Sequence, residues 1–169
     1  MAIGTLEGAH RALAGDLDQI GAGANRRAYY DREDRCVYKV GHIWSSDVHD
    51  QVLDPECLGN IHEAQRAHEL RAEAEDDACE WATVRYVPEA DLIQVRDTWG
   101  GMINVLAMEY IPGPTLGDLD DAPSPEAGLI MDADVDFFGE MAMNLVDLHM
   151  GNLKQMKDGR IAVIDLGCG

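Results

Sequence analysis

The stretch from Ile111 to Gly117, which reads Ile-Pro-Gly-Pro-Thr-Leu-Gly, constrains the fold of this chain more than any other feature. Closely spaced prolines and glycines prevent a continuous helix or strand from passing through it. The stretch therefore divides the 169 residues into a longer first part, 1–111, and a shorter second part, 112–169. We predict two small lobes with a crevice at this linker, because ligand sites often form where compact parts meet.

The first part is predicted to be an antiparallel sheet with helical additions. The spacing of apolar residues predicts a short leading helix over 1–15 and a second helix over 59–77, with Asn60 in its N-terminal cap. Strands are predicted over 27–30, 35–40, 83–87, 92–97 and 102–111, and the polar residues 41–58 are expected to be irregular.

The second part is predicted to contain one helix and one hairpin. Apolar residues recur at helical spacing over 133–146, and two short strands over 153–156 and 160–164 flank a Lys157-Asp158-Gly159 turn. The order of strands, helix, strands, linker, helix and hairpin is typical of the α+β class.

The charge of the chain limits its partners. There are 13 Lys and Arg residues against 32 Asp and Glu residues, a net charge of −19. Such a surface repels nucleic acids and anionic membranes, so we predict neither as a partner. It favours a basic partner or a bound cation, although solubility alone or mimicry of DNA would also account for it. The apolar share of 46% is that of a folded protein.

The sequence predicts a cytoplasmic protein with reduced thiols. The four cysteines form no Cys-x-x-Cys pair, which argues against a zinc site. The N-terminal residues lack the apolar core of a secretory signal, and no apolar run approaches the roughly 20 residues that cross a bilayer.

Three polar residues near the end of the sequence have a spacing that suits phosphoryl transfer. Four residues separate Asp147 from Asn152, and Asp165 follows the apolar strand of the hairpin. Carboxylate and amide oxygens are the ligands that Mg²⁺ prefers, and a further carboxylate beside the attacking hydroxyl assists the reaction.

The first part of the chain contains matching features in the same order. Gly21 and Gly23 form a glycine-rich turn, and Lys39 follows in an otherwise apolar strand. The helix over 59–77 offers Glu63 as an ion-pair partner for Lys39, with Glu69 or Glu56 as alternatives.

Together these segments resemble the protein-kinase-like superfamily. The sequence motif Asp147-Leu-His-Met-Gly-Asn152 is most similar to that of small kinases of bacterial viruses and of the aminoglycoside phosphotransferase-like branch. The resemblance implies a kinase-like N-lobe, built from an antiparallel sheet plus one helix. It also implies a minimal C-lobe of one main helix and a catalytic-loop hairpin.

The resemblance implies ATP and Mg²⁺ as cofactors and assigns a role to each matching residue. Asp147 would be the catalytic base, Lys39 would hold the α- and β-phosphates, and Glu63 would fix Lys39. The ATP-binding residues would be Gly21 and Gly23 over the phosphates, Met108 at the back of the pocket, and Glu109 and Ile111 at the hinge, whose backbone would bind adenine. The Mg²⁺ ligands would be Asn152 and Asp165.

The sequence departs from the family pattern in three places. Arg26 replaces the third glycine of the phosphate loop, and Leu145-Val146 replaces the His-Arg before the catalytic Asp. The sequence also ends soon after Asp165-Leu-Gly, where a full kinase continues into its substrate-binding lobe. We therefore expect a reduced C-lobe that binds its substrate on a small surface, is completed by a partner, or binds nucleotide without efficient turnover.

Three functions follow from these expectations. The first is transfer of the γ-phosphoryl group of ATP to a hydroxyl, with protein Ser/Thr favoured as acceptor and the host cytoplasm as location if the protein is viral. The second is phosphorylation of a small molecule of the aminoglycoside type. The third is a non-catalytic, acidic binding protein that inhibits or scaffolds a partner.

Overall fold

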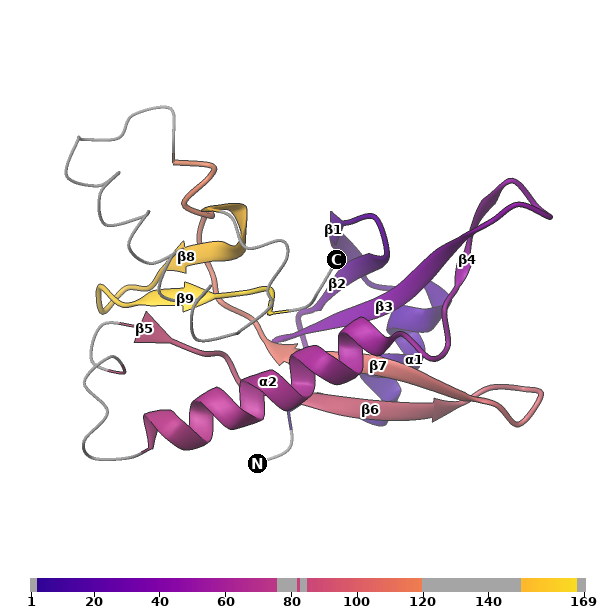
Figure 1. Cartoon of the computed structure of the whole chain (residues 1–169), viewed down its shortest axis with the longest axis horizontal. Coiled ribbons are helices and arrows are strands. Elements are labelled where there is room, and N and C mark those ends of the chain that lie inside the picture. The colour runs from indigo at the N-terminus through magenta and orange to yellow at the C-terminus, as the bar shows by residue number, and fades with distance from the viewer. Residues whose placement is uncertain (1–2, 76–81, 83–84, 120–149, 167–169) are drawn as a thin grey trace. The chain divides into compact units, whose positions relative to one another are not determined.

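The structure is a computed structural model that describes residues 3–75, 82, 85–119 and 150–166 (Figure 1). The chain divides into two compact units, one within Met1–Gln65 and Glu89–Tyr110, the other within Arg66–Pro88 and Ile111–Cys168. Each unit combines helix and sheet, which confirms the predicted α+β class. The helix predicted over 133–146 lies outside the described residues.

The first unit contains a six-stranded antiparallel sheet in which the chain order and the spatial order differ. Its strands are β1 (Asp18–Ala22), β2 (Arg26–Asp31), β3 (Cys36–Ser45), β4 (Asp50–Leu53), β6 (Ala90–Arg96) and β7 (Met102–Glu109). The order across the sheet is β1-β2-β3-β7-β6, and β4 pairs with the far end of β3. The long strand β3 therefore lies at the centre and contacts three other strands.

Helix α1 (Leu6–Ala14) and the first part of helix α2 (Leu58–Ala74) lie on opposite faces of this sheet. Helix α1 approaches β3 where the Thr5 backbone N–H donates to the Tyr38 hydroxyl at 2.8 Å. Helix α2 approaches β3 where Lys39 Nζ meets Glu63 at 2.8 Å. Successive residues of a strand point to opposite faces. The start of α2 and the whole of α1 therefore lie on different sides of β3, as Figure 1 shows.

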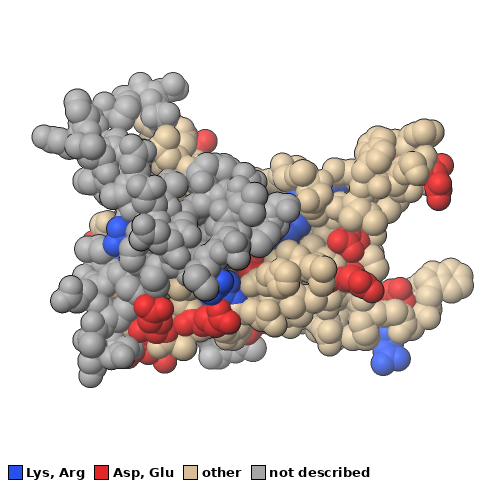
Figure 2. All heavy atoms as spheres, viewed as in Figure 1, with Lys and Arg blue, Asp and Glu red and all other residues tan. Residues whose placement is uncertain are grey.

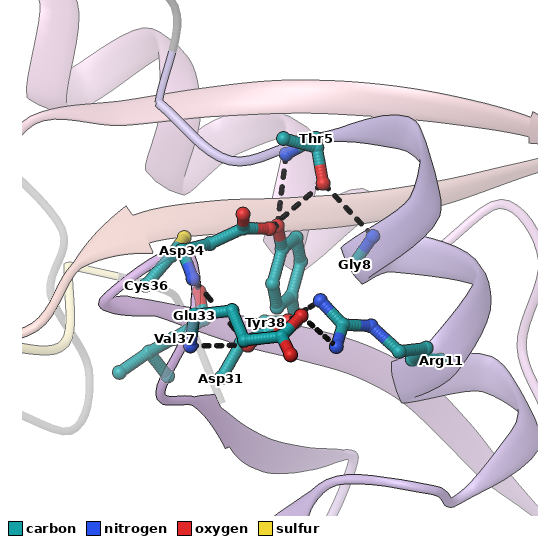
Figure 3. A network of polar contacts seen from close by, with 9 residues as sticks. All are labelled: Thr5, Gly8, Arg11, Asp31, Glu33, Asp34, Cys36, Val37 and Tyr38. Atoms are coloured by element: carbon teal, nitrogen blue, oxygen red, sulfur yellow. Dashed lines mark hydrogen bonds and ion pairs between the residues drawn. The ribbon is translucent and has the colours of Figure 1, made fainter.

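The face under α1 holds an apolar core. Small side chains on α1 allow a close approach to the sheet, and at Gly8 an added Cβ would lie 2.1 Å from the Tyr38 hydroxyl. Thr5 caps the helix by accepting from the Gly8 N–H at 2.9 Å and donates its own hydroxyl to Asp34 at 2.7 Å (Figure 3). The buried residues of this core are Ala9, Ala12, Tyr29, Cys36, Tyr38, Val40, Val95, Ile103, Val105 and Ala107.

Ion pairs also connect α1 to the turn between β2 and β3. Arg11 donates to the buried carboxylate of Asp31 and, at 2.7 Å, to the exposed carboxylate of Glu33. The second carboxylate oxygen of Asp31 accepts the backbone N–H groups of Glu33 and Asp34 (Figure 3). The turn between β2 and β3 is thereby tied to α1.

Two predictions about the region before α2 were wrong. Residues 41–58 are not irregular, because β3 continues to Ser45 and pairs with β4, and the two strands form a ribbon that projects from the sheet (Figure 1). Asn60 does not cap α2, because the helix begins at Leu58 and Asn60 lies within its first turn. Its side chain instead donates to the carbonyl oxygens of Lys39 and Asn104, at 2.8 and 3.0 Å.

The second unit contains a small sheet that includes the predicted hairpin. Strands β8 (Leu153–Gln155) and β9 (Ile161–Val163) are antiparallel, and β5 (Arg85–Tyr86) pairs with β9 in parallel. A single 3₁₀ turn, η2 (Met150–Asn152), leads into β8. The linker runs beside it, since the Leu116 N–H donates to the Leu153 carbonyl at 2.8 Å.

None of the helices in the described ranges has both the length and the apolar character that a membrane-spanning helix needs. Acidic side chains are spread over the face of the molecule shown in Figure 2 and outnumber the basic ones in the sequence.

Candidate functional site

The most distinctive polar feature of the first unit is an ion pair between Lys39 and Glu63. Lys39 Nζ lies 2.8 Å from Glu63 Oε1, and the two side chains are only 7% and 1% exposed. The alternative partner, Glu69, is an exposed residue that pairs with Arg66 at 2.9 Å. The structure therefore brings Glu63, not Glu69, to Lys39.

A second cation shares the same carboxylate. Arg26 contacts Oε2 of Glu63 through Nη1, and its side chain is 13% exposed. Arg26 begins β2, directly after the glycine-rich turn, where the Gly23 N–H donates to the Arg26 carbonyl at 2.8 Å. The carboxylate of Glu63 is thus contacted by two cations, one from β2 and one from β3.

The backbone of β3 and α2 holds this cluster in place. The Asn60 side chain bridges the carbonyls of Lys39 and Asn104 and so fixes the first turn of α2 against β3 and β7. At Gly41 an added Cβ would lie 2.5 Å from Cys57 Cβ, so the strand and the residue that precedes α2 can approach closely only because Gly41 has no side chain. One turn after Asn60, Glu63 is then directed at the strand that carries Lys39.

Lys39 also lies in one row with Gly21, which the structure places in strand β1 and not in a turn. The strand register pairs Gly21 with Ala28, Ala28 with Lys39, and Lys39 with Leu106. Paired residues of neighbouring strands direct their side chains to the same face, and neighbouring strands are about 4.8 Å apart. Gly21 is thus two strands away from Lys39, on the same line across the sheet.

The rest of this sheet face is apolar. We call it the Lys39 face and define it by Ala28, Val37, Lys39, Leu106 and Met108, which share one side of the sheet by register. Val37, Leu106 and Met108 are buried, and Ala28 is half-buried.

An aromatic pair lies at one end of the Lys39 face. Tyr30 pairs with Val37 in the register, and its ring lies 4.1 Å from the ring of Tyr110, measured between centroids, with the planes tilted by 32°. Tyr110 directly follows β7 and the predicted hinge residue Glu109. The Glu109 N–H donates to the Glu89 carbonyl at 2.8 Å, which fixes the end of β7.

The other predicted hinge residue, Ile111, belongs to the second unit and is buried there. Its carbonyl oxygen accepts a hydrogen bond from Lys154 Nζ at 3.0 Å. Burial lowers the pKa of Lys154 from its ordinary value. The backbone just after β7 is therefore tied to β8 of the hairpin.

The two predicted metal ligands lie close together in the second unit. The Asn152 carbonyl accepts the backbone N–H of Ile164 at 2.8 Å, and Asp165 is the next residue. Both side chains are half-buried, at the end of the hairpin where β8 begins and β9 finishes. The third predicted residue of this segment, Asp147, lies outside the described residues.

Within the described ranges, no three His, Cys, Asp or Glu side chains gather closely enough to form a metal site. An Asn amide is outside that set. The backbone contact between Asn152 and Ile164 brings the segments of Asn152 and Asp165 together, and the role of these two residues as Mg²⁺ ligands stays a prediction.

Sequence reasoning missed two parts of the site. Arg26 was recognised only as a departure from the glycine pattern, although it contacts the same carboxylate as Lys39. Ala28 and Tyr30 were not recognised as part of the Lys39 face. The period-2 alternation of β2 would have placed both on that face once its pairing with β3 was known.

Comparison with known proteins gives likenesses to solved structures but no sequence relative. No protein family and no curated protein matches the chain. Among solved structures, the chain is similar to the MAP kinase LmaMPK10 from Leishmania major, with 14% identity and a TM-score of 0.46. The match covers 96% of this chain and 51% of the kinase, so the chain spans about half the length of that protein.

Proposed function

We propose that this chain binds ATP with Mg²⁺ and transfers the γ-phosphoryl group to a hydroxyl group, with a protein Ser or Thr side chain as the acceptor. The buried ion pair between Lys39 and Glu63 is the observation that carries this proposal. Burial of two charges is costly and stabilises a fold weakly at best. A pair kept at this position is better accounted for by a need to hold one ammonium group in a fixed direction.

The Lys39 face offers complementary surroundings for ATP. In this proposal, adenine lies against the apolar residues of that face and hydrogen-bonds to the Glu109 carbonyl and the Ile111 N–H, with Met108 at the back. Lys39 holds the α- and β-phosphates, and Glu63 keeps Lys39 extended. The backbone at Gly21 and Gly23 lies over the phosphates.

The hairpin offers oxygen ligands for the metal. In this proposal, Asn152 and Asp165 would hold Mg²⁺, which would supply positive charge beside the phosphate oxygens. Asp147 accepts the proton of the acceptor hydroxyl as its oxygen bonds to the γ-phosphorus and the bond from that phosphorus to the β–γ bridging oxygen breaks. The products are a phosphate ester and ADP.

The test is incubation of the purified protein with γ-labelled ATP and Mg²⁺, using Ser/Thr peptides, a cell lysate and an aminoglycoside as separate acceptors. We expect label in protein, and a loss of at least 100-fold in Lys39→Met, Asp147→Asn and Asp165→Asn. Lys157→Met, which changes an exposed lysine, is the matched control for Lys39→Met and should retain activity. Label on the aminoglycoside alone would move the acceptor to small molecules, and unchanged labelling in all three variants would refute the proposal.

A second candidate is nucleotide binding without turnover, as in a non-catalytic scaffold. The contact between Arg26 and Glu63 favours it, because a cation at the start of β2 then holds a carboxylate oxygen of the residue that pairs with Lys39. Thermal unfolding with millimolar ATP and Mg²⁺ separates the candidates, since a bound ligand raises Tm whether or not it reacts. A raised Tm without labelled product supports the second candidate, and an unchanged Tm contradicts both.

A further inference from the structure

Large apolar side chains are exposed together at one end of the sheet in the first unit. Ten large hydrophobic residues are exposed in the described ranges, and seven of them belong to this end: Ile43, Trp44, Val48, Leu53, Leu58, Trp99 and Met102. Trp44 is 65% exposed and Trp99 is 93% exposed. Single exposed apolar residues are normal, whereas a group of them in one place marks an interaction site.

Two hairpins carry most of these residues and leave the sheet at the same end. Strand β3 pairs with β7 up to Val40 opposite Val105, and beyond that point β3 continues into its ribbon with β4. Strand β7 begins at Met102, just beyond the same point, after its turn from β6. Because β3 and β7 are antiparallel, the ribbon and this turn project from one end of the sheet (Figure 1).

The segment between β4 and α2 joins the bases of the two hairpins. The Asp54 N–H donates to the Gly41 carbonyl on β3 at 2.9 Å. The Asn104 side chain on β7 donates to the Glu56 carbonyl at 2.8 Å. The side chains of Asp54 and Glu56 therefore start from the backbone that lies between the ribbon and β7.

The turn that carries Trp99 has a fixed backbone. One carboxylate oxygen of Asp97 accepts the N–H groups of Trp99 and Gly101, at 2.8 and 2.6 Å, and the Asp97 N–H donates to the Gly101 carbonyl at 2.9 Å. The indole ring is nevertheless almost fully exposed. A large ring on an ordered backbone loses little entropy on binding, and Trp is enriched among the residues that dominate binding energy.

The ribbon exposes apolar groups on both of its faces. Ile43 pairs with Val52, and the next residue, Trp44, pairs with Gln51. Successive residues of a strand point to opposite faces, so the Ile43–Val52 pair and Trp44 lie on different faces. Folding the ribbon back onto its own sheet could bury only one of these faces. Another molecule is needed to cover the rest.

Acidic side chains accompany these apolar groups. Residues 40–65 contain no Lys or Arg, and the ribbon and the segment after it carry Asp47, Asp50, Asp54 and Glu56. All 13 Lys and Arg residues of the chain lie in the described ranges, and none of them forms an ion pair with these four carboxylates. A cation that pairs with them must therefore come from another molecule.

Two basic side chains lie at the margins and leave the surface acidic. Arg96 pairs with Met102 in the register, and Arg27 donates to Gln51 at 3.3 Å. They offset at most two of the four carboxylates. We call this region the hairpin surface and define it by Ile43, Trp44, Val48, Trp99 and Met102 together with Asp47, Asp50, Asp54 and Glu56.

We propose that the hairpin surface binds a basic segment of another protein. Lys and Arg side chains of that segment pair with the four carboxylates, and its apolar side chains pack against Trp44 and Trp99. Complementary charge accelerates association and selects the partner. A second copy of this chain would bring the same acidic surface and a net charge of −19, so repulsion opposes self-association. The proposal does not depend on nucleotide binding.

The test is selection of a random library of 12-residue peptides on the full chain, followed by fluorescence anisotropy with the enriched peptides in synthetic form. We expect an enriched motif that combines Lys or Arg with Leu or aromatic residues. Its affinity should fall at least tenfold in Trp99→Ser and in Trp44→Ser. Leu6→Ser is the matched control, because Leu6 is 56% exposed on α1, and it should change the affinity less than twofold.

A second pair of variants tests the charge. Asp47→Asn with Glu56→Gln removes two exposed carboxylates from the hairpin surface and should weaken binding at least tenfold. Glu7→Gln with Asp16→Asn removes the same charge from exposed positions in and after α1 and should weaken it less than twofold. Because every substituted side chain is exposed, Tm should change little, and thermal unfolding verifies that each variant is folded.

The outcomes separate this proposal from its alternatives. Equal weakening by the two double variants would reduce the binding to general attraction by an acidic chain and overturn the proposal. An enriched motif without Lys or Arg, or no enriched peptide, would also overturn it. So would self-association of the wild type that is lost in Trp99→Ser, which sedimentation measures. Lys39→Met should bind the peptides as the wild type does, because the hairpin surface shares no residue with the Lys39 face.

Discussion

At the residue scale, the carboxylate of Glu63 connects two cations that come from different elements. Lys39 belongs to β3 and Arg26 to β2, and both contact Glu63 on α2. A buried charge that loses its partner is far more costly than the pair itself is stabilising. Substitution of Glu63 and substitution of Lys39 should therefore lower the free energy of unfolding by different amounts.

We expect Glu63→Gln to lower the free energy of unfolding by about 3–5 kcal/mol, because two largely buried cations lose their shared anion. Lys39→Met should lower it by less than half as much, since Glu63 keeps Arg26 as a partner. Urea unfolding of both variants measures the difference. Arg66→Met breaks an exposed pair and should cost no more than about 1 kcal/mol. Equal losses in the two buried variants would show that Arg26 does not compensate for Lys39.

Single residues of this site were predictable to different degrees. Lys39 is identifiable because it is the one charged residue in an apolar run of its strand, and Glu63 because it lies near the start of the helix that follows. Arg26 was not predictable as a partner of Glu63. Its side chain reaches across the space between β2 and α2, and no local pattern encodes a contact between residues 37 positions apart.

At the scale of elements, the docking of α1 depends on one missing side chain. Gly8 faces Tyr38, whose hydroxyl donates to Asp34 at 2.6 Å and accepts the Thr5 N–H. An added Cβ would lie 2.1 Å from that hydroxyl and 2.6 Å from an Asp34 carboxylate oxygen. Because these contacts are backed by the sheet, the helix must shift outward if Gly8 is replaced.

We expect Gly8→Ala to destabilise the protein by about 1–3 kcal/mol, the usual cost of overpacking a well-packed core. Gly23→Ala is a suitable control, because its Cβ would meet only the Arg26 carbonyl, at 3.8 Å. That variant should stay within about 1 kcal/mol of the wild type. Thermal or urea unfolding measures both. A Gly8→Ala protein as stable as the control would mean that α1 does not pack tightly on Tyr38.

The elements were predictable where burial imposes a period on the sequence. Strand β7 and the first half of β3 are buried and apolar, and the prediction found both. The ribbon of β3 and β4 was missed because none of its paired residues is buried, so neither face shows the alternation that marks a half-buried strand. The prediction that Asn60 caps α2 was wrong because its side-chain amide donates to the carbonyl groups of two strand residues and not to the end of the helix.

At the scale of the whole molecule, the net charge of −19 opposes compaction. Repulsion between exposed carboxylates is long-ranged at low ionic strength and is screened by salt. The buried contacts of Glu63 are screened much less. Added salt should therefore stabilise the protein as a whole, in contrast to proteins that depend on surface ion pairs.

We expect Tm to rise by several degrees when NaCl increases from about 0.01 M to about 0.15 M, because the Debye length falls from about 30 Å to about 8 Å. MgCl₂ at equal ionic strength is the informative comparison. If Tm rises equally in MgCl₂ and NaCl, screening alone accounts for the rise. A larger rise of Tm in MgCl₂ indicates bound Mg²⁺. A fall of Tm with NaCl would contradict the view that repulsion among carboxylates dominates the surface.

The α+β class followed from the order of the predicted elements, whereas the division of the chain into units did not follow from the linker alone. Residues 66–88 group with the hairpin because β5 pairs with β9, a parallel contact between strands about 76 residues apart. Two-residue strands of this kind have no periodicity to detect.

The alternation of Tyr38 and Lys39 on β3 has a consequence for how the gene for this protein can vary. The Tyr38 side chain contacts Thr5 beside α1, and the Lys39 side chain contacts Glu63 on α2. The register of this strand therefore cannot shift by even one residue without exchanging these contacts. Inserting or deleting one codon between Cys36 and Val40 would exchange the two faces, placing an ammonium group in the apolar core and a phenol beside Glu63. A substitution along β3 changes the contacts of one side chain on one face. A change of its length by one residue alters the contacts with both helices.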